Sequence, residues 1–137
     1  MKLVDSSVVV DIDRGGVDRK VRKLDDEGRH AISIVSMTEL RLVVEKQYDT
    51  GSEAYERAVE DLERLLARFN VVPISRTVAL GAAEIIADLQ DRGEPLHDLH
   101  DVYIAATARA EKLPVLTANV DHFDRIDEVR VVDWQEF

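Results

Sequence analysis

The stretch Leu3-Val4-Asp5-Ser6-Ser7 decides how this chain begins to fold. Lys2 to Val4 predict a short strand, and a helix is expected to follow from about Ser6. Asp5 then lies where the chain leaves the sheet at the carboxyl end of the strand. This is a typical place for an active-site residue, although Asp also satisfies free amides at the start of a helix. Asp5 is therefore a candidate for a helix cap, a metal ligand or both.

The rest of the chain alternates between short β-branched runs and longer helical periods. Further strands are predicted over Val71 to Ile74, Val115 to Thr117 and Val129 to Val132. The helical periods fall into three apolar stripes, namely Tyr55, Ala58, Val59, Leu62, Leu65, Leu66 and Phe69; Val78, Ala82, Ile85, Ile86 and Leu89; and Ile104, Ala105 and Ala108. Ser52 is a candidate cap for the first of these helices. The pattern predicts an α/β fold in which helices flank a central, mostly parallel sheet of short strands.

Length and composition favour one intracellular domain. The 137 residues suit a single domain over 1–137, and 45% hydrophobic residues suffice for a core. Cysteine is absent, which excludes disulfides and thiolate metal sites. The sequence shows neither a signal peptide nor an apolar run long enough for a membrane span. A soluble, cytoplasmic protein without membrane attachment is expected.

The net charge of −10 argues against nucleic-acid binding through a basic surface. Divalent ions can, however, bridge acidic side chains to phosphate, and the 13 Arg outnumber the 5 Lys, which suits recognition of phosphate by a planar fork. A basic protein partner and a solvated surface adapted to high salt are the alternatives.

Two more acids stand near the start of predicted helices. Glu39 lies in Ser36-Met37-Thr38-Glu39-Leu40, which matches a capping box in which Glu39 bonds back to the Ser36 amide. The helix also carries an apolar face, formed by Met37, Leu40, Val43 and Val44, that anchors its first turn and could aim Glu39 inward. Asp101 heads the stripe through Ile104, where an isolated buried carboxylate is costly unless a partner or cation compensates it.

A fourth polar segment, Thr117 to Phe123, follows the strand that ends at Thr117. Asn119 and Asp121 could each reach the same site as the acids, or serve only in Asx turns. Oxygen ligands from four distant segments suit Mg²⁺ or Mn²⁺. His97 and His100 have no Cys or second His pair beside them, which disfavours zinc, and Asp98 is expected to cap the helix that carries Asp101.

At these residues the sequence resembles the PIN-domain family, and within it the VapC-like toxins of type II toxin–antitoxin pairs. The resemblance covers the whole chain and rests on four segments: Leu3 to Val8, Ser36 to Leu40, Asp101 to Ala108, and Leu116 to Phe123. It implies a parallel-sheet fold, a homodimer, a cognate antitoxin and metal-dependent cleavage of RNA by acids that match Asp5, Glu39 and Asp101.

The chain departs from the fuller family pattern at Asn119, where many relatives carry an acid. Asp121 could replace it, and the choice decides between one and two bound metals. Ser6 matches a small hydroxyl residue of the family that touches metal-bound water or caps the helix. Two other classes stay open: a PIN-like binding module without activity, and a phosphoryl-accepting or phosphatase-like α/β domain in which Asp5 is the nucleophile. The latter fits poorly because position 7 is Ser rather than Asp.

Overall fold

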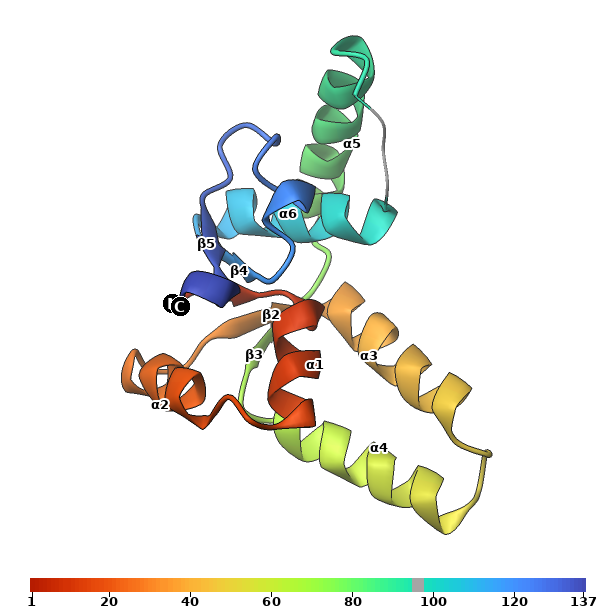
Figure 1. Cartoon of the computed structure of the whole chain (residues 1–137). Coiled ribbons are helices and arrows are strands. Elements are labelled where there is room, and N and C mark those ends of the chain that lie inside the picture. Colours follow the sequence, from red (N-terminus) through yellow and green to blue (C-terminus); the bar gives the residue numbers. More distant parts are fainter. Residues whose placement is uncertain (95–97) are drawn as a thin grey trace.

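A five-stranded parallel sheet forms the centre of the molecule (Figure 1). The computed structural model describes residues 1–94 and 98–137. The strands lie in the order β3-β2-β1-β4-β5, and every neighbouring pair is parallel. Their bounds are β1 Leu3–Val4, β2 Ala31–Ser33, β3 Asn70–Val72, β4 Val115–Thr117 and β5 Val131–Asp133. This confirms the predicted fold class.

Helices cover both faces of the sheet, because successive residues of a strand point to opposite sides. Leu3, Ala31 and Val115 face one core, which α5 (Arg76–Asp91) and α6 (Leu99–Glu111) close. Their neighbours along the strands, Val4, Ile32 and Leu116, face a second core. That core is closed by α1 (Ser6–Arg14), α2 (Asp18–Asp26), α3 (Ile34–Gln47) and α4 (Glu53–Leu66). Figure 1 shows the two layers above and below the strands.

Several predicted boundaries agree with the structure, and others shift. Helices begin at Ser6 and after the Ser52 cap, as expected, and β4 has the predicted bounds. The strand predicted at Val71 to Ile74 lies at Asn70–Val72, and the one predicted at Val129 to Val132 lies at Val131–Asp133. Phe69 packs into the core from the turn after α4. Val43, expected on the buried face of α3, is exposed.

The chain ends in a short 3₁₀ turn, η2 (Trp134–Glu136), that packs beside α1 and α2. Trp134 is buried, and its indole Nε1 donates a hydrogen bond to Asp11 Oδ2 at 2.7 Å. Lys20 of α2 donates to the Trp134 carbonyl at 2.7 Å, and its ammonium lies 5.0 Å from the centre of the Trp134 ring. Among the described helices, none is both long and apolar enough to cross a membrane.

Candidate metal centre

Asp5 is a buried carboxylate held from three sides. It follows β1 and caps α1, where Oδ1 accepts the Ser6 N–H at 2.9 Å. Its other oxygen, Oδ2, accepts the Ser7 hydroxyl at 2.8 Å and the Thr117 hydroxyl at 2.9 Å. Only 4% of the Asp5 surface is exposed. The strand-end position and the capping role predicted for Asp5 are therefore confirmed together.

The alignment of β1 with β4 explains why Thr117 reaches Asp5. The Asp5 N–H donates to the Leu116 carbonyl at 2.9 Å, so Asp5 and Thr117 leave adjacent parallel strands at the same edge. Both hydroxyls that hold Asp5 are themselves anchored, since Ser7 Oγ accepts the Ala118 N–H and Thr117 Oγ1 accepts the Asn119 N–H. The network fixes the carboxylate before any ligand binds.

Glu39 lies in the second turn of α3 and takes no part in a capping box. The predicted box is wrong because the helix begins at Ile34 with Ser33 as its cap, and the Ser33 hydroxyl accepts the Val35 N–H at 3.2 Å. The misplacement came from β2, a strand of three residues that ends directly at this cap. Glu39 is thereby free to face the other acids, and its Oε1 atom is buried without a hydrogen-bond partner among the described residues.

Burial and neighbouring charges change the acidity of Glu39. Desolvation, reinforced by the charges of Asp5, Asp98 and Asp101, raises the pKa of Glu39 from its ordinary 4.5 to about 7, although His100 acts in the opposite direction. A carboxylate that keeps its proton up to neutral pH lacks a compensating cation. The raised pKa thus identifies Glu39 as part of a cluster of acidic side chains.

Asp101 belongs to the same cluster and lies in the first turn of α6. Desolvation, with the charges of Asp5 and Asp98, raises the pKa of Asp101 from 3.8 to about 6, against the effect of His122. His122 Nδ1 lies 2.9 Å from Asp101 Oδ2, so an Nδ1–H tautomer donates to the carboxylate. Asp101 faces inward from the helix, as the stripe through Ile104 predicted.

Asp98 and His100 also join the cluster, although no sequence pattern placed them at the site. Asp98 caps α6 as predicted, accepting the His100 N–H at 2.8 Å, but it also lies close to Glu39. His100 Nδ1 is 3.5 Å from Asp98 Oδ1 and 3.8 Å from Glu39 Oε2. One ligand atom from each of these three residues fits within 4.8 Å of the others. His97, dismissed with His100 as a zinc ligand, lies outside the described residues.

Asn119 and Asp121 lie near the acids, in a hollow of the protein surface. Both are exposed and line a hollow with His122, Asp133 and Gln135. His122 joins this hollow to the acids through its contact with Asp101. The role of Asn119 or Asp121 as the fourth ligand stays a prediction.

These residues suit a hard divalent cation. Asp5, Glu39, Asp98 and Asp101 affect one another electrostatically and offer oxygen atoms, which Mg²⁺ and Mn²⁺ prefer. The buried, unpaired Glu39 Oε1 is an atom that a cation would satisfy. A divalent cation would also offset the burial and the neighbouring negative charges that raise the pKa of Glu39 and Asp101.

The fold agrees with comparisons to known proteins. The family model described as PIN domain matches residues 2–129, and the chain belongs to the PIN-domain family. Within that family it is similar to proteins named VapC. Ribonuclease VapC1 of Methanocaldococcus jannaschii is 32% identical over 126 residues, covering 92% of this chain and 81% of the relative.

Two further relatives extend the comparison. A tRNA(fMet)-specific endonuclease VapC of Shigella flexneri is 30% identical over 109 residues, covering 80% of this chain and 78% of the relative. DNA-bound VapBC of Salmonella typhimurium superposes with a TM-score of 0.80 at 27% identity, covering 98% of this chain and 99% of that one.

Proposed function

We propose that this chain, as one PIN-like domain over residues 1–137, is a Mg²⁺- or Mn²⁺-dependent endoribonuclease that acts as a toxin in the cytoplasm. The observation that carries the proposal is the convergence of Asp5, Glu39 and Asp101: burial, reinforced by the negative charge of Asp5, raises the pKa of both Glu39 and Asp101. The ribonuclease and endonuclease names of the relatives support the same reaction class. The proposed reaction is hydrolysis of an RNA phosphodiester bond.

Each side chain of the site has a separate role in the proposed reaction. A cation held by these residues would supply a water of lowered pKa and would stabilise charge on the leaving oxygen. Asp5 and Asp101 would be direct ligands, Asp5 fixed by its two hydroxyl donors and Asp101 oriented by His122. Glu39, once ionised, would hold the metal or orient the attacking water through its free Oε1. Asn119 or Asp121 would complete the ligand set.

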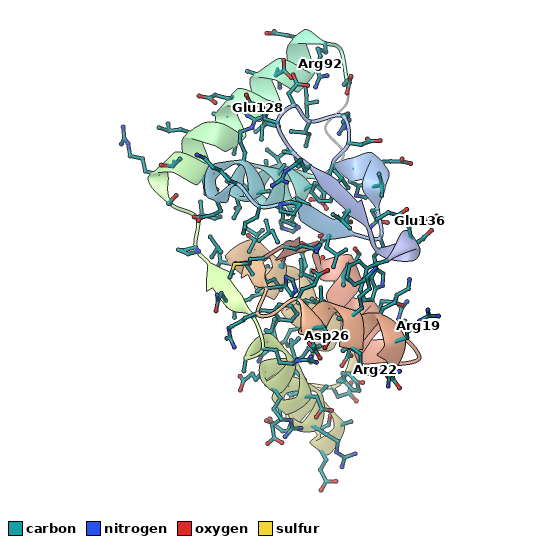
Figure 2. The ribbon with its side chains drawn as sticks, turned by 90° about the vertical axis from the view of Figure 1, so that its left-hand side faces the viewer. Arg19, Arg22, Asp26, Arg92, Glu128 and Glu136 are labelled. Carbon is teal, nitrogen blue, oxygen red and sulfur yellow. The ribbon has the colours of Figure 1, made fainter. Side chains whose placement is uncertain are left out.

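Cleavage assays with purified protein test this function. The panel contains initiator and elongator tRNAs and unrelated RNAs, each with Mg²⁺, Mn²⁺ or a chelator. We expect metal-dependent cuts that Asp5→Asn, Glu39→Gln or Asp101→Asn reduces at least about 100-fold. Asp26→Asn is the matched control, because Asp26 is an exposed acid of α2 on the outer surface (Figure 2). Activity that survives in Asp5→Asn, or cleavage by no form of the protein, contradicts the proposal.

The fourth position can be decided with the same assay. If Asp121 completes the site, Asp121→Asn lowers activity and apparent metal affinity, whereas Asn119→Ala does so if Asn119 is the ligand. Loss of a residue that only orients a ligand costs roughly 10- to 100-fold in metal affinity or activity, so loss of the ligand itself should cost at least as much. If both variants match Asp26→Asn, the site is formed by the four clustered carboxylates without either residue.

The proposal includes two protein partners. A cognate antitoxin with basic side chains would complement the acidic cluster and the net charge of −10. The VapBC assembly of the Salmonella protein supports a partner of this kind. A homodimer is the second expectation, and it rests on the family resemblance. Light scattering with and without the product of the adjacent gene measures both the homodimer and the complex with the antitoxin. A protein that stays monomeric and does not bind that product contradicts both expectations.

A further inference from the structure

A cavity of about 580 Å³ extends from the acids along α1. Ser6, Glu39 and His100 line it at the candidate metal centre, and Arg14 and Lys20 also contribute to its wall. Arg14 ends α1, eight residues after Ser6. A helix rises about 1.5 Å per residue, which places Arg14 roughly 12 Å along the helix axis from Ser6. The cavity thus connects Glu39 to Arg14 and Lys20, and the Asp11 carboxylate in the same wall accepts the Trp134 indole N–H.

Of the two cations that line this cavity, Lys20 already has protein partners. Its ammonium donates to the Trp134 carbonyl at 2.7 Å and to the Gln135 carbonyl at 3.4 Å. The Arg14 side chain makes no hydrogen bond or ion pair within residues 1–94 and 98–137. Its five N–H donors are therefore available to a ligand.

The backbone after Arg14 is uncovered as well. Gly15 and Gly16 both have positive φ, and a Cβ at either position would meet nothing within 4 Å. Glycine is favoured in this conformation, and the Arg14 side chain that precedes the two glycines is itself exposed. The approach to Arg14 from solvent is open.

We propose that Arg14 binds a backbone phosphate of the RNA, a few nucleotides from the bond that the acidic cluster cleaves. The inference deepens the proposed function and rests on it. A guanidinium forms paired, charge-assisted hydrogen bonds with phosphate, and Arg14 offers such a group in the wall of the cavity that Glu39 also lines. Arg14 would repel a basic segment of a protein partner, so the observations favour RNA.

The salt dependence of RNA binding tests the contact directly. All proteins carry Asp101→Asn to keep the RNA intact, and the probe is a short fluorescein-labelled single-stranded oligouridylate. Each phosphate contact to a single strand contributes about 0.7 to the slope of log affinity against log salt. Arg14→Gln should reduce the slope by about 0.7 between roughly 50 and 200 mM salt, and Arg14→Lys should preserve it.

Arg19→Gln is the matched control for the loss of one positive charge. Arg19 lies on α2, is exposed and is not part of the cavity wall; Figure 2 shows it beside Arg22 at the surface. The slope of log affinity against log salt for Arg19→Gln should equal that of the parent protein. If Arg14→Gln and Arg19→Gln give the same slope at unchanged melting temperature, the inference is wrong while the proposed function stands.

Kinetics in proteins with an intact Asp101 provide a second readout. Because Arg14 lies away from the reacting atoms, Arg14→Gln should raise KM several-fold and leave kcat nearly unchanged. A fall in kcat alone contradicts the anchoring role. If the parent protein binds neither the oligouridylate nor any RNA of the cleavage panel, the inference fails together with the proposed function. If Arg14→Gln weakens binding of the antitoxin and not of RNA, the cavity belongs to the protein partner, and the inference is wrong.

Discussion

Thr117 controls the position of Asp5 through a single buried hydroxyl. Thr117→Val keeps the shape of the side chain and removes the donor to Asp5 Oδ2. We expect roughly 10- to 100-fold weaker activity or metal affinity, because the carboxylate loses one of its orienting partners. Loss of a partner for a buried polar group should also cost about 1–3 kcal/mol of stability.

Thr107→Val is the control for this substitution. Thr107 is equally buried, but its hydroxyl donates to the Tyr103 carbonyl of its own helix at 2.7 Å. Cleavage assays, metal titrations and urea unfolding of both variants separate the two positions. Equal losses of activity in Thr117→Val and Thr107→Val would contradict an orienting role for Thr117.

Individual acids were easier to find in the sequence than their partners. Asp5 and Asp101 were identifiable because each carboxylate lies beside apolar residues of one short segment. Thr117 contacts Asp5 across 112 positions of sequence, and His122 reaches Asp101 from a separate turn. Such contacts depend on strand order, which single-segment patterns do not contain. Of these partners, only Thr117 could be suspected from the sequence, because its hydroxyl lies at the end of a predicted strand.

At the scale of elements, the start of α3 determines where Glu39 points. Ser33→Ala removes the hydroxyl that caps the helix and should destabilise the protein by about 0.5–2 kcal/mol. Ser36→Ala should be neutral or slightly stabilising, because the buried Ser36 hydroxyl has no partner among the described residues. Urea unfolding measures both. If Ser36 formed a capping box, Ser36→Ala would destabilise the protein more than Ser33→Ala.

Strand β2 and helix α2 were not predicted from the sequence, and each has a weak sequence pattern for a physical reason. Strand β2 has only three residues, and Ser33 both ends it and caps the next helix, which obscured the boundary. Helix α2 is highly charged, and Leu24 is its one fully buried residue. Its position depends on contacts such as Lys20 with the Trp134 carbonyl, which connect distant parts of the chain. By contrast, α5 was evident because Val78, Ala82, Ile85 and Leu89 are buried at helical spacing.

At the scale of the whole molecule, stability should depend on pH and metal together. Folding raises the pKa of Glu39 to about 7 and of Asp101 to about 6, so the folded state holds these protons more tightly than the unfolded state. Their stabilising effect is complete below the ordinary values of 4.5 and 3.8 and is lost as pH rises through 6 and 7. The melting temperature of metal-free protein should therefore fall between about pH 5 and 7.5.

Divalent metal should reverse this trend, since the cation binds ionised carboxylates. Mn²⁺ is expected to raise the melting temperature more at about pH 7.5 than at about pH 5.5. Glu39→Gln combined with Asp101→Asn should flatten both dependences. A metal-induced rise that is equal at the two pH values, or that persists in the double variant, would contradict the assignment and favour an inactive binding module.

The position of Trp134 gives the molecule a built-in optical reporter. It is the one tryptophan of the chain, it lies in the wall of the cavity beside α1, and its indole donates to Asp11, another residue of that wall. Emission from an indole responds to nearby charge and to hydrogen bonding, so occupancy of the cavity can be followed in unlabelled protein. The fluorescence recorded during unfolding and the fluorescence recorded during RNA titration then originate from a single, known place in the structure.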